Sequence, residues 1–120
     1  MRPPVWIGHV SLKVHSLSES EQFYLKTGLR LIFKNDAVCI LELRGGTHLI
    51  LGVDANAESG NAEFDFMVEN VDESHESYRE AGLKVSDISR GDIHDSFFLT
   101  DPSANRITVN STHVDDHSLV

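Results

Sequence analysis

The chain has 120 residues, an amount of sequence that suits one hydrophobic core. Its 10 Lys and Arg against 19 Asp and Glu give a formal charge of −9, and an acidic surface of that kind repels nucleic acid and anionic lipid headgroups. The apolar runs are of strand length, well below the roughly 20 residues that cross a bilayer, and the first residues lack the pattern of a signal peptide. A single cysteine, Cys39, lies in such a run, where a buried thiol is expected rather than a nucleophile. We therefore expect one soluble, cytoplasmic domain over residues 1–120, without a nucleic-acid or membrane partner.

The first half of the chain has the pattern of a strand, a helix and three further strands. Residues 9–14 (HVSLKV) alternate polar and apolar side chains, as a half-buried strand does. A helix is expected over about 18–27, with Ser16 or Ser18 as its N-cap and Gly28 in the left-handed position that ends it. The alternation then resumes in three segments, LRLIF, AVCILEL and HLILGV.

The second half has the same pattern. FDFMV alternates as a strand, and a helix is expected over about 72–81, capped by Asp72. The segments LKVSDI, DSFFLT and RITVNS then alternate, and a turn with Pro102 in its second position joins the last two. The polar residues 54–63 read as the connector between the halves.

A shift of 54 residues relates the two halves. It brings Gly28 onto Gly82 and Tyr24 onto Tyr78. At the same shift, the apolar residues Val10, Leu12 and Val14 fall on Phe64, Phe66 and Val68. The sequence therefore predicts two copies of one β-α-β-β-β unit, about 5–53 and 62–113, and an α+β fold.

Each predicted unit leaves one face of its sheet uncovered by its helix. By the two-residue period of a strand, the side chains that point to this open face are His9, Ser11 and Lys13 in the first unit and Glu63, Asp65 and Met67 in the second. Open faces that pair, within one chain or between two, would enclose a cavity for a ligand. The repeat places His9 and Glu63 at equivalent positions.

Four stretches of the chain resemble the vicinal oxygen chelate superfamily: GHVSLKVHSLSESEQFYLKTGLRL, RGGTHLILG, FDFMVENVDESHESYREAGLKV and FFLTDPSANRITV. That superfamily includes glyoxalases, bleomycin-resistance proteins, fosfomycin-resistance proteins and extradiol dioxygenases. The resemblance covers nearly the whole chain and implies a glyoxalase-like domain, a small-molecule ligand or substrate and a homodimer. It is more specific for fold than for activity, because one fold hosts several chemistries.

In the metal-dependent members of the superfamily, the first and last strands of both units hold a divalent ion. The resemblance implies His9, His48 and Glu63 as the corresponding ligands, with Ile50 as an alternative to the position of His48. The last-strand carboxylate of the family falls on Thr108, which is a neutral hydroxyl. Two imidazoles and one carboxylate suit Zn²⁺, Mn²⁺, Fe²⁺ or Ni²⁺, and such an ion acts as a Lewis acid toward a substrate oxygen.

Two functions from different classes fit these residues. The first is a divalent-metal-dependent enzyme of the isomerase, lyase or dioxygenase type, with Asp65 or His94 as a catalytic acid or base. The second is a non-catalytic protein that binds or sequesters a small molecule, resembling the bleomycin-resistance members, without a metal. His113 and His117, in the tail, are further candidate ligands, although a solvated terminus is the simpler interpretation.

Overall fold

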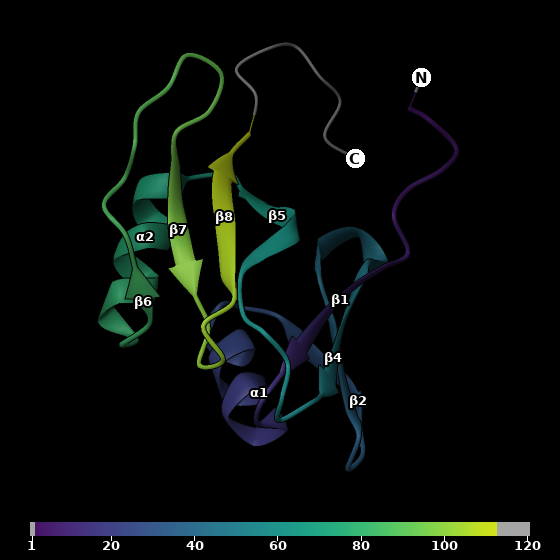
Figure 1. Ribbon diagram of the computed structural model, residues 1–120. Coiled ribbons are helices and arrows are strands. Elements are labelled where there is room, and N and C mark those ends of the chain that lie inside the picture. The colour runs from purple at the N-terminus through teal and green to yellow at the C-terminus, as the bar shows by residue number, and fades with distance from the viewer. Residues whose placement is uncertain (1, 113–120) are drawn as a thin grey trace. The chain divides into compact units, whose positions relative to one another are not determined.

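The computed structural model describes residues 2–112, which form two compact units, residues 2–58 and 59–112 (Figure 1). In each unit a strand and a helix are followed by three further strands. The predicted β-α-β-β-β pattern and the α+β fold class are therefore confirmed for both halves of the chain. Within the described residues, no helix combines the length and the apolar character needed to span a membrane.

The first unit contains β1 (His9–Val14), α1 (Leu17–Lys26), β2 (Arg30–Lys34), β3 (Val38–Glu42), the short 3₁₀ turn η1 (Arg44–Gly46) and β4 (His48–Val53). Its strands form one sheet in the order β1-β4-β3-β2. β1 runs parallel to β4, and the other neighbours are antiparallel. The first and last strands of the unit therefore lie side by side.

The second unit contains β5 (Asn61–Val68), α2 (Val71–Glu80), β6 (Lys84–Val85), β7 (Ser96–Thr100) and β8 (Arg106–Ser111). The order β5-β8-β7-β6, with β5 parallel to β8, repeats the topology of the first unit. β6 is shorter than the predicted strand LKVSDI, because the chain leaves the sheet after two paired residues. It returns to β7 through a loop that is tied by a bridge between Ser89 and Ser96.

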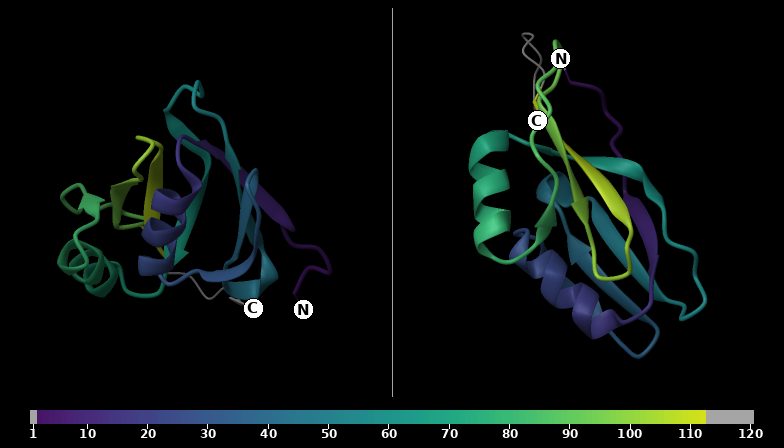
Figure 2. Two further views of the ribbon diagram at one scale, coloured as in Figure 1. Left: turned by 90° about the horizontal axis from the view of Figure 1, so that it is seen from below. Right: turned by 60° about the vertical axis from the view of Figure 1, so that its left-hand side comes forward.

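The helix of each unit lies on one face of its own sheet, and that face forms the core (Figure 2). In the first unit the buried side chains of the sheet are Leu12, Val14, Cys39, Leu41, Leu49 and Leu51. In the second unit they are Phe66, Phe97, Leu99, Ile107 and Val109. The two helix tyrosines, Tyr24 and Tyr78, are buried as well. Because strand side chains alternate, the intervening residues lie on the opposite, open face of each sheet.

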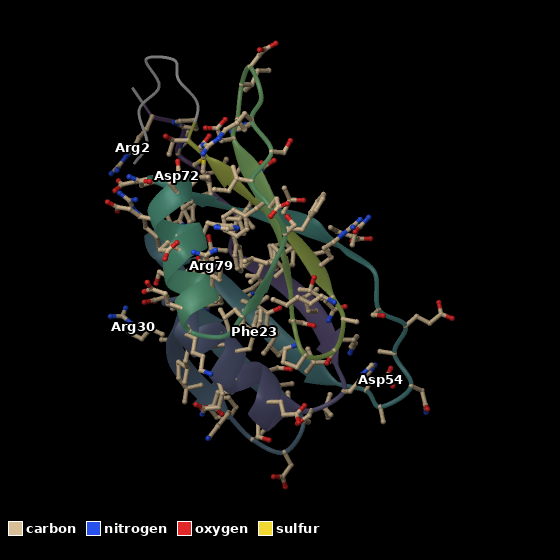
Figure 3. All side chains as sticks on the ribbon, turned by 90° about the vertical axis from the view of Figure 1, so that its left-hand side faces the viewer. Arg2, Phe23, Arg30, Asp54, Asp72 and Arg79 are labelled. Atoms are coloured by element: carbon tan, nitrogen blue, oxygen red, sulfur yellow. The ribbon has the colours of Figure 1, made fainter. Side chains whose placement is uncertain are left out.

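Side-chain caps begin both helices. The hydroxyl of Ser16 accepts a hydrogen bond from a first-turn N–H of α1 at 3.4 Å, as predicted. The cap of α2 is Asn70, whose side chain accepts from a first-turn N–H at 3.1 Å, so the prediction of Asp72 was wrong. Asp72 lies within the first turn, at the amino end of α2 (Figure 3), where its hydrogen bonds with Arg90 lower the pKa of its carboxyl.

A buried carboxylate links α1 to the edge of its sheet. Glu21 is buried on the helix and accepts a hydrogen bond from Nζ of Lys34, on β2, at 3.0 Å. A buried carboxylate without a partner would be costly, so this contact offsets the cost of burial. Burial, with a smaller effect of the Glu21 charge, raises the pKa of the Cys39 thiol. The thiol is thus buried and protonated, as expected for a structural cysteine.

The repeated glycine-leucine pair ends both helices in the same way. Gly28 and Gly82 have φ of +102° and +83°, which is the left-handed region. The N–H of the following leucine donates to the carbonyl of Tyr24 in the first unit and of Tyr78 in the second, at 3.2 and 3.0 Å. This is the Schellman arrangement, which satisfies a terminal helix carbonyl. It explains why the same spacing of tyrosine, glycine and leucine occurs twice.

A tight turn joins β7 to β8. The buried carboxylate of Asp101 accepts hydrogen bonds from the N–H groups of Ser103 and Asn105, each at 2.9 Å. Pro102 follows it in the second position of the turn, as predicted. Ala104 has φ of +65°, a conformation that an L side chain adopts only with strain.

We predict that Gly82→Val lowers the free energy of unfolding by about 1–3 kcal/mol. No heavy atom lies within 4 Å of the added Cβ, so the left-handed φ alone accounts for the loss. Gly60→Val is the matched control, because its Cβ also meets open space and its φ is outside that region. Urea unfolding measures both variants, and equal losses would contradict the assigned role of Gly82.

We also predict that Ala104→Gly raises the free energy of unfolding, by roughly 0.5–1 kcal/mol. Glycine removes the strain of the positive φ, and this gain exceeds the added entropy of the unfolded chain. The control is Ala81→Gly, at the C-cap of α2 with φ of −78°, which should be destabilising. Thermal and urea unfolding of the two variants should therefore give shifts of opposite sign.

Candidate functional site

Four polar side chains form a row across the open face of the first sheet. His9 on β1 is paired with His48 on β4, His48 with Glu42 on β3, and Glu42 with Arg30 on β2. Directly paired residues point to the same face of a sheet, so the four side chains follow one another from edge to edge. All four are exposed or half-buried.

The two histidines of this row lie against each other. Their ring centroids are 5.7 Å apart and their planes are inclined by 22°. Nε2 of His48 is 3.8 Å from a carboxylate oxygen of Glu42, and Arg30 forms an ion pair with the same carboxylate. A cation, a carboxylate and two imidazoles thus lie in series at one end of the sheet.

Sequence analysis had identified His9 and His48 but not Glu42 or Arg30. Arg30 and Glu42 are ordinary polar residues at strand ends, and only the pairing of β2, β3 and β4 brings them into line with the histidines. The one signal available in the sequence was the hairpin register, because residues paired across a hairpin lie on one face.

The separation of the two histidine rings can be compared with that of two imidazoles on one divalent ion. Two imidazole nitrogens bound to one ion at tetrahedral angles hold their ring centroids about 5–6 Å apart, given the usual metal–nitrogen distance. The observed separation of 5.7 Å is in this range. However, residues 2–112 contain no group of three or more His, Cys, Asp or Glu side chains that could hold a metal ion. The described residues thus bring two imidazole rings together without a complete protein ligand set.

The third predicted ligand, Glu63, lies on β5 in the second unit and is exposed. Its environment differs from that of His9, because β5 is irregular here. Asn61 is paired with Arg106, yet the next paired residues are Asp65 and Thr108, so four steps on β5 match two on β8. Glu63 lies within this bulge and has no directly paired neighbour on β8, whereas His9 is paired with His48.

The strand pairings also identify which last-strand positions correspond. In the first unit Ser11 is paired with Ile50, and in the second Asp65, which is 54 residues later, is paired with Thr108. Thr108 therefore corresponds to Ile50 by pairing, and His48 occupies a different step of the strand. At these two corresponding positions the first unit has an apolar residue and the second a hydroxyl.

The two predicted acid–base residues are each bonded to β8. Asp65 lies on the open face, opposite Phe64 and Phe66, and accepts a hydrogen bond from the side-chain amide of Asn110. Nδ1 of His94, in the loop before β7, lies 2.7 Å from the carbonyl oxygen of Ser111. A carbonyl oxygen only accepts, so Nδ1 is the donor of this hydrogen bond. His113 and His117 lie outside the described residues.

Comparisons with known proteins bear on the fold. Neither family models nor curated protein sequences give a match to the chain. Among solved structures, a glyoxalase/bleomycin resistance protein/dioxygenase from Alicyclobacillus acidocaldarius is 24% identical, with a TM-score of 0.75 and coverage of 100% of both chains. A lactoylglutathione lyase from Agrobacterium tumefaciens is 23% identical (TM-score 0.77; 92% of this chain, 96% of that one).

A third similar structure is TnmS3, an antibiotic binding protein from Streptomyces sp. CB03234. It is 18% identical, with a TM-score of 0.76, and the match covers 93% of this chain and 99% of that one. At such identities the likeness concerns the fold, and enzymes and binding proteins both have it. The chain has the glyoxalase-like fold of the glyoxalase/bleomycin resistance protein/dioxygenase superfamily.

Proposed function

We propose that this protein binds a divalent metal ion through His9 and His48 and acts on a small oxygenated substrate. The observation that supports this most is the pairing of the two histidines on one open sheet face, with ring centroids 5.7 Å apart. Neutral imidazole nitrogens suit Zn²⁺, Mn²⁺, Fe²⁺ or Ni²⁺. Such an ion supplies Lewis-acid stabilisation to an oxygen that gains negative charge.

The other residues of the proposed site are a third ligand, a neighbouring ion pair and a candidate acid and base. Glu63 is the proposed third ligand, and Glu42, held by Arg30, places negative charge beside His48. Asp65 and His94 are the proposed acid and base, since each is a titratable group with a hydrogen-bond partner on β8. A homodimer in the cytoplasm is part of the same proposal.

A second candidate function is the binding of a small molecule without metal. The open face of the second sheet supports it, because the large apolar side chains of Met67 and Phe98 are 55% and 41% exposed there. Thr108 lies on the same face. It is a neutral hydroxyl at the position where the resemblance to metal-dependent members of the superfamily implies a carboxylate. The similar structure described as an antibiotic binding protein shows that this fold serves such a role in another protein.

Metal titration distinguishes the two functions. We expect the metal-free protein to bind Zn²⁺ or Co²⁺ with a measurable heat, and His9→Ala or His48→Ala to weaken binding by about 100-fold or more, because each removes a direct ligand. The free energy of unfolding without metal should hardly change, since both rings lie on an open face. Calorimetry and the visible spectrum of bound Co²⁺ are the measurements.

The matched control for this titration is His15→Ala. His15 is an exposed histidine of the same unit, and its ring bonds to the carbonyl oxygen of Ala57. The variant therefore removes an imidazole that does not belong to the His9–His48 pair. Protein that is purified without metal and that ignores Zn²⁺, Co²⁺ and Mn²⁺ would favour the binding-protein function instead.

A further inference from the structure

The loop between β6 and β7, residues 86–95, is tied to the sheet at both ends (Figure 1). Near its start, Ser89 exchanges two backbone hydrogen bonds with Ser96, of 2.7 and 2.9 Å. At its end, Asp95 is bonded to Ser111 of β8. The N–H of Ser111 donates to the carbonyl oxygen of Asp95 at 2.9 Å, and the N–H of Asp95 donates to the hydroxyl of Ser111 at 3.0 Å. The turn of residues 90–94 lies between these two ties.

An arginine joins this turn to the neighbouring helix. The two terminal nitrogens of Arg90 donate to the carboxylate of Asp72, in the first turn of α2, at 3.1 and 2.6 Å. Nη1 of Arg90 also donates to Asp95 at 3.0 Å. The hydrogen bonds to Asp72 and Asp95 raise the pKa of the Arg90 guanidinium. A single exposed ion pair stabilises little, but this guanidinium connects two carboxylates of different elements and is bidentate to one of them.

The carboxylate of Asp95 also closes the turn on itself. One of its oxygens accepts from Arg90, and the other accepts from the N–H of Gly91 at 3.3 Å. Gly91 has no room for a side chain, because a Cβ there would lie 2.5 Å from the carbonyl oxygen of His94. That separation is too short for two non-bonded atoms. The backbone of Gly91 therefore lies directly against the backbone of His94.

The same turn places the ring of His94 at the end of β8. Its Nδ1 donates to the carbonyl oxygen of Ser111 at 2.7 Å, so the residue that binds the backbone of Asp95 also binds this imidazole. The hydrogen bond made by one ring nitrogen decides which nitrogen carries the proton. Donation from Nδ1 makes Nε2 the basic nitrogen when the ring is neutral.

We propose that Arg90 and Gly91 are positioning residues for His94. They hold its ring so that Nδ1 donates to the carbonyl of Ser111 and Nε2 is the nitrogen that takes up or releases a proton. Arg90 acts through Asp95, and Gly91 acts by leaving room for the His94 carbonyl. The inference rests on the proposed function, in which His94 is an acid or base, but all its contacts lie within the second unit.

The first test is the tautomer of His94 in ¹⁵N-labelled protein without metal or substrate. Two-bond ¹H–¹⁵N correlation spectra, recorded above about pH 8 where an ordinary imidazole is neutral, identify the protonated nitrogen of each ring. We expect the Nδ1–H form for His94 in the original chain. Arg90→Gln and Gly91→Ala should give a mixture of both forms, because the ring is held less firmly. A ring that is mainly Nε2–H in the original chain would overturn the proposal.

The second test is hydrogen exchange of the Asp95 and Ser111 amides. Arg90→Gln should speed their exchange about three- to tenfold, because the bonds to two carboxylates are lost. Arg90→Lys should have a smaller effect, since lysine keeps the charge without the bidentate geometry. Arg79→Gln is the matched control: it breaks an exposed ion pair with Glu76 on α2 and should change neither the tautomer nor the exchange. Equal results for Arg90→Gln and Arg79→Gln would overturn the role of Arg90.

Gly60→Ala is the matched control for Gly91→Ala, because a Cβ at Gly60 has no heavy atom within 4 Å. The unfolding midpoint shows whether each variant is folded. Asp72→Asn loosens the turn without a change in the loop, and it should reproduce the effect of Arg90→Gln. A fixed Nδ1–H ring in a protein that binds no metal would contradict the proposed function alone. A ring without a fixed tautomer in a protein that binds metal would contradict this inference alone.

Discussion

One constraint underlies the whole molecule: each four-stranded sheet has a single helix to cover it. The helix takes one face, and the alternation of a strand sends every second side chain to the other. In a fully covered sheet those positions would be apolar. Here they carry imidazoles, carboxylates and guanidinium groups together with a few large apolar side chains, so the open faces hold the residues of the candidate site.

The two open faces are chemically different although the folds beneath them are alike. The first has a row of four polar side chains across its strands. Arg30 forms an ion pair with Glu42, and the imidazoles of His48 and His9 come next in the row. The second has one guanidinium on an aromatic ring and one carboxylate held by an amide. The two units therefore share their core pattern, while the residues between the core positions differ. This is consistent with a fold whose similar structures include both enzymes and binding proteins.

The fold was predictable because its signals are local and occur twice. The left-handed glycine after each helix, the alternation of the strands and the turn at Pro102 all depend on neighbouring residues. The site was less predictable because it depends on which strands pair and in which register. The bulge that isolates Glu63 leaves no trace in the alternation. The cap of α2 was missed for another reason: Asn70 and Asp72 are both good caps, and they lie two residues apart.

The parallel pairing of the first and last strands in each unit has a consequence for how the protein is made. His9 can meet His48 only after the helix and the two strands between them have been synthesised, so β1 cannot join its sheet until β4 is available. On a ribosome, the first strand of each unit would wait unpaired through the synthesis of the rest of that unit. The order of synthesis therefore favours the antiparallel β2–β3–β4 meander as the early structure, and the edge formed by β1 as the last to be added.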